Sequence, residues 1–342
     1  MNHAELIERV ARLEPVDRVP FALLSSGSWA INSKGCTLEN ALAEPAETVA
    51  DWLYEGYTAA DSAMSWVGSG YFNIVIRALG GKIKWRKKGT PDVSEVLLKS
   101  VQDISRVDTG LVAQDKDVVK LYDITRYLVA REEGQRLVGS SMWGPFTLAG
   151  LLFGAEALMR SVYKDREATE KLLEFAEEVY LKFIQGFIES GAKVIFMAEP
   201  SASGDMISRK HFESTALPYI KDAFQRLSGK GLILGLHICG DVTDRLDLIA
   251  DSGIQIMSLD YKVDLARAKE AFKGKIAFAG NLNPVSVVQS GTPEEIVAET
   301  LRSIETVGTK SGYIVMPGCD IPPSTPLFNL QTISRTVSSY KV

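Results

Sequence analysis

Cysteine and histidine are both scarce in this chain, with three of each among 342 residues. Three cysteines in a chain of this length are too few for a disulfide framework, so we expect a reducing, cytoplasmic location. No run of about 18 apolar residues is present, which excludes a membrane-spanning helix by length. The first residues lead directly into an amphipathic helix pattern and show no signal peptide.

An excess of positive charge is also absent, because 43 acidic residues outnumber 38 lysines and arginines and give a formal net charge of −5. Such a balance argues against a nucleic-acid-binding surface. The densest basic stretch, residues 82–88, alternates charged and apolar side chains in its first half, which is typical of a solvated edge strand. We therefore expect neither a nucleic acid nor a membrane as partner.

Short apolar runs alternate with longer helical patterns along the chain. Continuous apolar runs of this kind are typical of buried parallel strands. The runs are residues 19–24, 62–66, 137–143, 194–197, 232–236, 254–259, 276–279 and 313–316, and the main helical patterns are residues 166–190, 209–227, 242–251, 265–272 and 293–307. Eight strands with intervening helices predict an α/β fold, a (β/α)₈ TIM barrel that forms a single domain over residues 1–342. Residues 68–133 depart from this rhythm and predict an insertion between strands two and three. A doubly wound open sheet is the alternative, because periodicity does not show closure.

The scarce residue types gather at the ends of two predicted strands. His237 and Cys239 follow the fifth run, and Cys319 follows the eighth. Side chains two positions apart on an extended segment share a face, and a barrel brings the C-terminal ends of its strands to one mouth. Two thiolates and one imidazole suit Zn²⁺ and leave a coordination position open for substrate. We therefore predict that these three residues bind zinc; the alternative is an ordinary loop histidine beside a buried cysteine.

Two carboxylates, Glu199 and Asp260, also follow predicted strands and are candidate catalytic residues. Glu199 could be a labile fourth metal ligand, a partner that holds the histidine tautomer, or a general base. A plain loop carboxylate is the alternative. Asp260 has the same range of interpretations, although a carboxylate beside bound thiolates is better suited to hydrogen bonding than to ligation.

Trp143 and Asn281 are candidate residues for contact with a cofactor or substrate. Trp143 ends the third run and could form an aromatic wall of a pocket. Asn281 follows Gly280, whose missing side chain permits a close approach to the backbone. Both positions lie at predicted strand ends, where a barrel places its active site.

Several of these motifs resemble the uroporphyrinogen decarboxylase superfamily, and within it the zinc-dependent corrinoid methyltransferase branch typified by methylcobamide:coenzyme M methyltransferase. The resemblance covers nearly the whole chain, and its two specific motifs are His237-Ile-Cys-Gly240 and the Pro-Gly-Cys-Asp-Ile-Pro-Pro-Ser-Thr-Pro stretch at residues 317–326. More general superfamily motifs are Arg18-Val-Pro20, Gly144–Thr147, Pro200–Ser203 and Gly280-Asn281. The resemblance implies a (β/α)₈ barrel, zinc on His237, Cys239 and Cys319, and cobalamin carried by a partner corrinoid protein.

The function implied by the resemblance is methyl transfer between a corrinoid protein and a small thiol such as coenzyme M. Two alternatives stay open: corrinoid-dependent O-demethylation of a methoxy compound, and metal-free decarboxylation of the uroporphyrinogen type. The decarboxylases carry arginines near their N-terminus that meet porphyrin carboxylates. The matching stretch after Pro20 is Phe-Ala-Leu-Leu-Ser-Ser-Gly-Ser-Trp and has no arginine, which argues against a substrate bearing many carboxylates.

Overall fold

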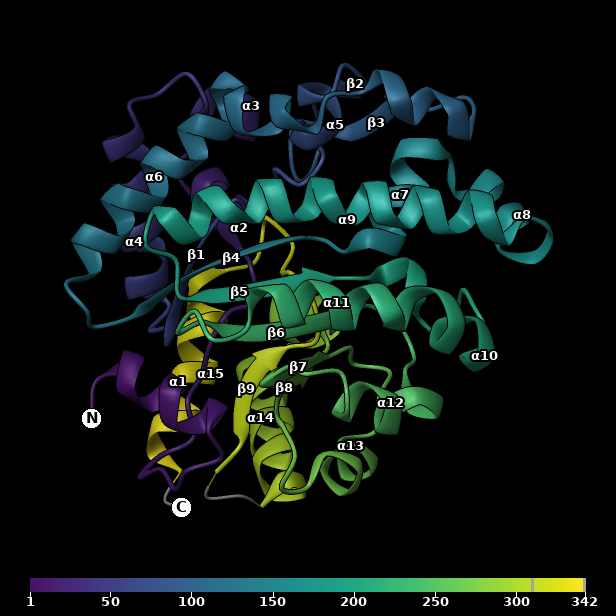
Figure 1. The fold of residues 1–342 in the computed structure, drawn as a ribbon. Helices are drawn as coiled ribbons and strands as arrows, with labels where there is room; N and C mark the ends of the chain where they lie inside the picture. The colour runs from purple at the N-terminus through teal and green to yellow at the C-terminus, as the bar shows by residue number, and fades with distance from the viewer. Residues whose placement is uncertain (309–310, 341–342) are drawn as a thin grey trace.

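Seven parallel strands form a curved sheet at the centre of the protein (Figure 1), seen in a computed structural model that describes residues 1–308 and 311–340. The strands follow one another around the sheet in the order β1-β4-β5-β6-β7-β8-β9. Their bounds are β1 Met64–Val67, β4 Leu137–Trp143, β5 Val194–Ala198, β6 Ile233–Ile238, β7 Ile256–Leu259, β8 Ala277–Leu282 and β9 Tyr313–Pro317. They correspond to the second to eighth predicted runs, and almost all of their residues are buried, as continuous apolar runs predict.

An irregular segment between α1 (His3–Ala11) and α2 (Gly27–Ser33) fills the gap between the edge strands β9 and β1. The N–H of Val315 donates to the carbonyl of Pro20, and the N–H of Ala22 donates to the carbonyl of Val315. On the other side, the N–H of Ala63 donates to the carbonyl of Phe21. Backbone hydrogen bonds therefore continue from one edge to the other and close the barrel. The first predicted strand is thus an irregular closing segment (residues 19–24) with one isolated bridge to β9, rather than a regular strand.

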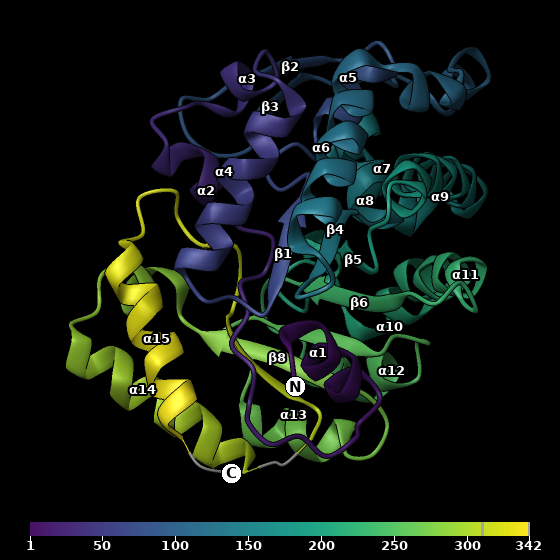
Figure 2. The same cartoon turned by 90° about the vertical axis from the view of Figure 1, so that its left-hand side faces the viewer.

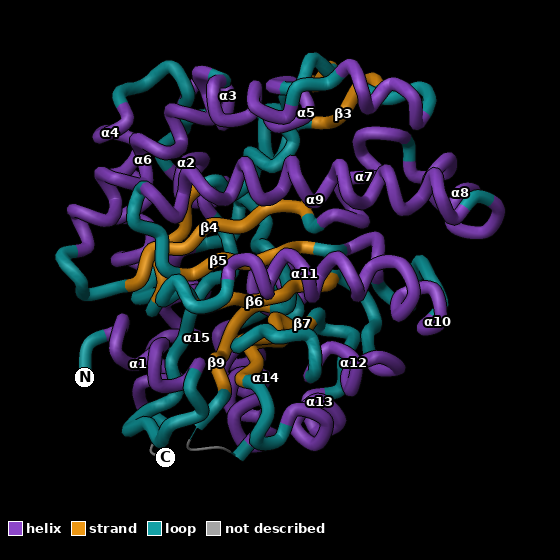
Figure 3. Tube along the Cα trace, viewed as in Figure 1, coloured by secondary structure: helices purple, strands orange, loops and turns teal. Residues whose placement is uncertain are grey.

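Helices surround the barrel, as the purple segments outside the orange strands show in Figure 3. The helices are α1 His3–Ala11, α2 Gly27–Ser33, α3 Leu38–Ala41, α4 Ala46–Ala59, α5 Ile74–Ala78, α6 Lys116–Glu132, α7 Pro145–Phe153, α8 Ala155–Lys164, α9 Arg166–Glu189, α10 Arg209–His211, α11 Leu217–Leu227, α12 Leu246–Ala250, α13 Leu265–Phe272, α14 Pro293–Val307 and α15 Leu327–Ser339. In the described part of the chain, no helix is long and apolar enough to cross a membrane.

Helices α13 and α14 have the bounds that the sequence predicts, because local signals fix their ends. Asp264 accepts hydrogen bonds from the first N–H groups of α13. Thr292 and Glu295 form a capping box at the start of α14, where Pro293 takes the first helical position. Gly308 ends α14 in the left-handed conformation.

The predicted insertion between the second and third barrel strands is present. It contains α5, α6 and an antiparallel hairpin of β2 (Lys82–Lys84) and β3 (Asp92–Glu95). The basic stretch lies on this exposed hairpin, and two of its five cations are paired within it. Lys82 lies 2.6 Å from Glu95, and Arg86 pairs with Asp92. These contacts agree with a solvated edge strand.

Helix α1 covers the N-terminal ends of the barrel strands (Figure 2). The N–H of Ala4 donates to the carbonyl of Gln135, which comes just before β4 begins. This end of the barrel is therefore closed. The C-terminal strand ends lie at the opposite end, where the predicted ligands are.

Candidate metal centre

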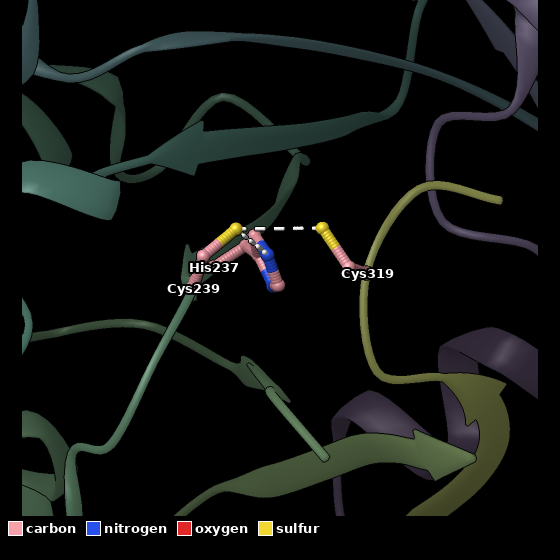
Figure 4. A group of neighbouring side chains, drawn as sticks. All are labelled: His237, Cys239 and Cys319. Carbon is pink, nitrogen blue, oxygen red and sulfur yellow. Dashed lines mark hydrogen bonds between the residues drawn. The ribbon is translucent and has the colours of Figure 1, made fainter. Parts of the chain in front are cut away.

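His237, Cys239 and Cys319 lie together at the C-terminal ends of the strands. His237 is the fifth residue of β6, Cys239 comes directly after that strand, and Cys319 follows β9. The Nε2 atom of His237 lies 3.0 Å from the Sγ of Cys239, which lies 3.4 Å from the Sγ of Cys319. Figure 4 shows the side chains pointing toward one another from two separate segments. The barrel thus brings together cysteines that are 80 positions apart.

The donor atoms of this cluster fit a zinc ion. With zinc–sulfur bonds of about 2.3 Å and zinc–nitrogen bonds of about 2.0 Å, a tetrahedral ion separates two sulfurs by about 3.8 Å and a nitrogen from a sulfur by about 3.5 Å. The observed separations are shorter than these by about half an ångström or less. Among residues 1–308 and 311–340, the group of ligand atoms within 4.8 Å of one another has no fourth member. A zinc ion bound by these three residues would have a fourth coordination position open.

The imidazole of His237 is held in place by the neighbouring strand. Its Nδ1 lies 3.0 Å from the hydroxyl of Ser258, which pairs with His237 in the register between β6 and β7. This contact leaves Nε2 free to face the sulfurs, which is the usual arrangement for a metal-binding histidine. Burial lowers the pKa of His237, but the contact with Cys319 and the charge of Asp260 raise it by more.

Asp260 supports the turn that carries Cys239. Its Oδ2 accepts the N–H of Gly240 at 2.9 Å, and its Oδ1 accepts the N–H of Lys262 at 2.9 Å. Gly240 has a φ of +99°, in the left-handed region that favours glycine. The buried carboxylate lies outside the three-residue group and holds the backbone next to one of its sulfurs.

Asp320, which sequence reasoning did not single out, supports Cys319 in a similar way. Its Oδ1 accepts the N–H of Ser26 at 2.9 Å and so joins the loop after β9 to the segment that closes the barrel. Ser25 and Ser26 both have a positive φ, which is uncommon for residues other than glycine. Burial raises the pKa of Asp320 to about 6. The available sequence signal was its position next to Cys319.

Glu199 faces helix α7 and not the metal-binding atoms. Its Oε1 accepts the N–H of Phe146 at 2.9 Å, and its Oε2 accepts the N–H and the hydroxyl of Thr147 at 2.8 and 2.7 Å. A side chain on Gly144 would come within 2.3 Å of Oε1, so glycine is required there. Burial raises the pKa of Glu199 to about 7, although the three hydrogen bonds act in the opposite direction. A carboxylate at this position stabilises the N-terminus of α7.

Trp143 and Asn281 lie at the mouth of the barrel, at the ends of β4 and β8. The Nε1 of Trp143 donates to the side-chain oxygen of Asn73 at 2.8 Å, and its half-buried ring packs 4.8 Å from that of Phe72. The amide of Asn281 donates to the carbonyls of Asp260 and Val263, at 3.0 and 2.6 Å. Trp143 is thus fixed at the end of β4 by its contacts with Phe72 and Asn73, whereas Asn281 stabilises the loop after β7.

The model of the uroporphyrinogen decarboxylase (URO-D) family matches residues 2–340 of the chain. The chain belongs to this family. Two similar relatives are the methylcobamide:CoM methyltransferases MtbA of Methanosarcina acetivorans and Methanosarcina mazei, which are 27% and 28% identical over 98% of this chain and 98% of theirs. A uroporphyrinogen decarboxylase of Danio rerio is 26% identical over 78% of this chain and 74% of its own.

A solved structure of a methyltransferase from Methanosarcina mazei has a similar fold. It matches with a TM-score of 0.88 at 21% identity, over 99% of this chain and 98% of that one. The predicted α/β barrel is therefore confirmed.

Proposed function

We propose that this URO-D family member is a methyltransferase that moves a methyl group between a corrinoid protein and a small thiol. The observation that carries the proposal is the convergence of His237, Cys239 and Cys319 at the mouth of the barrel. The names of the MtbA relatives support it, because a methylcobamide is a corrinoid and CoM is a thiol.

In this proposal the cluster holds zinc through the Nε2 of His237 and the two cysteine sulfurs. A zinc ion bound there would stabilise the thiolate form of a substrate thiol. Ser258 orients the imidazole, and Asp260 fixes the turn beside Cys239. These positioning contacts keep the ligand atoms facing one another before any substrate arrives.

Trp143 is proposed as part of the wall against which the substrate or the corrinoid lies. It pairs with Ala198 in the register between β4 and β5, and Ala198 pairs with His237 in the next strand pair. Residues that pair in this way point to the same face of a sheet. Trp143 and His237 are therefore on the same inner face, two strands apart.

The proposal is tested by the metal content of the protein and by the loss of methylcobalamin absorbance when thiols are added. We expect about one zinc per chain and thiol-dependent demethylation. Cys319→Ala should lose the metal and slow the reaction by more than about hundredfold, because removing a ligand exceeds the loss of a supporting contact.

Cys36→Ala is the matched control, because Cys36 is only partly buried and its thiol contacts the carbonyl of Thr37, not the cluster. It should keep both the metal and the rate. Full activity of the metal-free protein would contradict the proposal. Demethylation of O-methyl compounds by the reduced corrinoid, with no reaction of any thiol, would replace the thiol with a methoxy substrate.

A further inference from the structure

The loops at the mouth of the barrel carry many carboxylates and few cations. Four of these loops follow β5, β6, β7 and β9, the strands nearest in sequence to the cluster and to its supporting carboxylates, and comprise residues 199–208, 239–245, 260–264 and 318–326. Their acidic residues are Asp205, Asp241, Asp244, Asp260, Asp264 and Asp320, besides Glu199, which faces α7; their basic residues are Arg245 and Lys262, and Arg209 follows the loop after β5 at the start of α10. The mouth is therefore acidic before any ligand binds.

Each of the three cations at the mouth already has a carboxylate partner. Arg245 is fully buried and pairs with Asp244 at 2.8 Å. Its guanidinium also donates to the carbonyls of residues 202 and 207. Arg209 forms a two-pronged pair with Asp247, with both contacts at 2.6 Å.

The third cation, Lys262, lies 2.7 Å from the carboxylate of Asp205. Both side chains are nearly half exposed, so this pair is the weakest of the three. In the described part of the chain, no cation of these mouth loops is left over to neutralise an anionic substrate.

The inner wall beside the cluster is uncharged. Ala198 and Ser258 pair with His237 in the sheet and share its face, and Ser141 lies on the same face as Trp143, two residues before it. The hydroxyl of Ser141 lies 3.1 Å from that of Ser25. This wall offers hydrogen bonds and small apolar surfaces but no positive charge.

The metal itself would supply little positive charge. A divalent ion bound by two thiolates and a neutral imidazole has no net charge, because the two sulfurs cancel it. The nearby carboxylates of Asp260, which is buried, and Asp320, which is partly buried, accept hydrogen bonds from backbone N–H groups. A negatively charged substrate group would therefore meet repulsion in a partly dehydrated space, where charges interact more strongly than in water.

We propose that this site selects a small thiol without an anionic group, and discriminates against a thiol that carries a sulfonate or a carboxylate. The inference rests on the proposed function and narrows its substrate class. It also separates this chain from the MtbA relatives, because coenzyme M carries a sulfonate.

The test uses three thiols of the form HS–CH₂–CH₂–X that differ only in the charge of X. They are 2-mercaptoethanol (neutral), cysteamine (positive) and 2-mercaptoethanesulfonate (negative). The zinc-loaded protein is assayed for kcat/KM with methylcobalamin, and binding of each thiol is measured by calorimetry. We expect the neutral and positive thiols to react and bind about ten- to hundredfold better than the sulfonate, the effect of a like charge a few ångströms away in a protein.

A sulfonate that reacts and binds as well as the neutral thiol would overturn the inference and leave the proposed function standing. If none of the three thiols is methylated, the proposed function fails, and the inference fails with it.

A charge variant links the selectivity to the mouth. Asp205→Asn frees Lys262, so the preference against the sulfonate should shrink by up to about fivefold, the size of a surface charge interaction. Asp251→Asn is the matched control. Asp251 pairs with Lys275 at 3.0 Å, and Lys275 comes just before β8 begins, so this pair lies at the opposite end of the barrel. An unchanged preference in Asp205→Asn, or an equal change in both variants, would contradict a role of the charges at the mouth.

Discussion

The ends of β5 and β7 carry the same sequence pattern, a buried carboxylate directly after an apolar strand, yet the two carboxylates have different partners. Glu199 accepts hydrogen bonds from the first turn of α7. Asp260 accepts the N–H of Gly240, the residue after Cys239. In the first case, Gly144 after β4 makes room for the carboxylate of Glu199. In the second case, Gly240 after β6 takes a left-handed conformation.

This comparison shows that the pattern locates the mouth of a barrel but does not assign a role. The role of each carboxylate depends on which residues follow the neighbouring strand in the sheet. Beside Glu199, β4 leads into helix α7; beside Asp260, β6 leads into Cys239 of the cluster. The two carboxylates should therefore respond differently to the same chemical change.

The largest effect is expected for Asp260→Asn. The amide nitrogen of asparagine cannot accept the N–H of Gly240 or of Lys262, so one of the two hydrogen bonds is lost and the turn beside Cys239 loosens. Zinc affinity should fall by up to about hundredfold, as for other residues that support metal ligands. A zinc competition titration measures it.

The control for Asp260→Asn is Asp264→Asn, four residues further along, which alters only the N-terminus of α13. It should leave the zinc affinity unchanged. Equal affinities in wild-type protein and Asp260→Asn would show that this carboxylate does not support the site.

Glu199→Gln should give the opposite result, a loss of stability without a loss of zinc affinity. Glutamine has one acceptor oxygen where Glu199 accepts from three donors, so buried N–H groups on α7 are left unpaired. The free energy of unfolding should fall by about 2 kcal/mol. Urea unfolding measures this, and the zinc titration is repeated on the same variant. Weakened zinc binding with unchanged stability would assign Glu199 to the metal centre.

A third buried carboxylate, Glu177 of α9, lies away from the mouth and should show the smallest effect. Burial and a contact with Asp222 raise its pKa to about 8, so the folded chain binds its proton more tightly than the unfolded chain. The stability that this proton contributes is present at low pH and is lost as the pH rises through about 8. Glu177→Gln should flatten the dependence of unfolding free energy on pH between 5 and 8, measured by urea unfolding. Glu167→Gln, at an exposed position of the same helix, should not.

The fold was accessible to sequence reasoning where local signals carry it. Buried parallel strands leave continuous apolar runs, and caps such as the Thr292–Glu295 box fix helix ends. The structure of the first run was harder to predict. The N–H of Leu23 donates to the hydroxyl of Ser62, and residues 19–24 lack the regular backbone hydrogen bonds of a strand. Nothing in a local sequence pattern distinguishes such an irregular closing segment from a regular strand.

The cluster could be predicted because cysteine and histidine are rare in this chain and lie at strand ends. The supporting contacts could not be predicted in the same way. Asp320 meets the backbone of Ser26 across 294 positions, and Glu199 meets α7 across more than 50. Such contacts depend on the packing of neighbouring strand ends, which residue types alone do not specify.

X-ray absorption spectroscopy of the zinc-loaded protein, before and after a thiol is added, tests the central claim most directly. We expect two sulfurs at about 2.3 Å and at least one nitrogen at about 2.0 Å, with a third sulfur on addition of 2-mercaptoethanol and one sulfur fewer in Cys319→Ala. A protein that binds no zinc, or a sulfur count that neither the thiol nor the loss of Cys319 changes, would contradict the account.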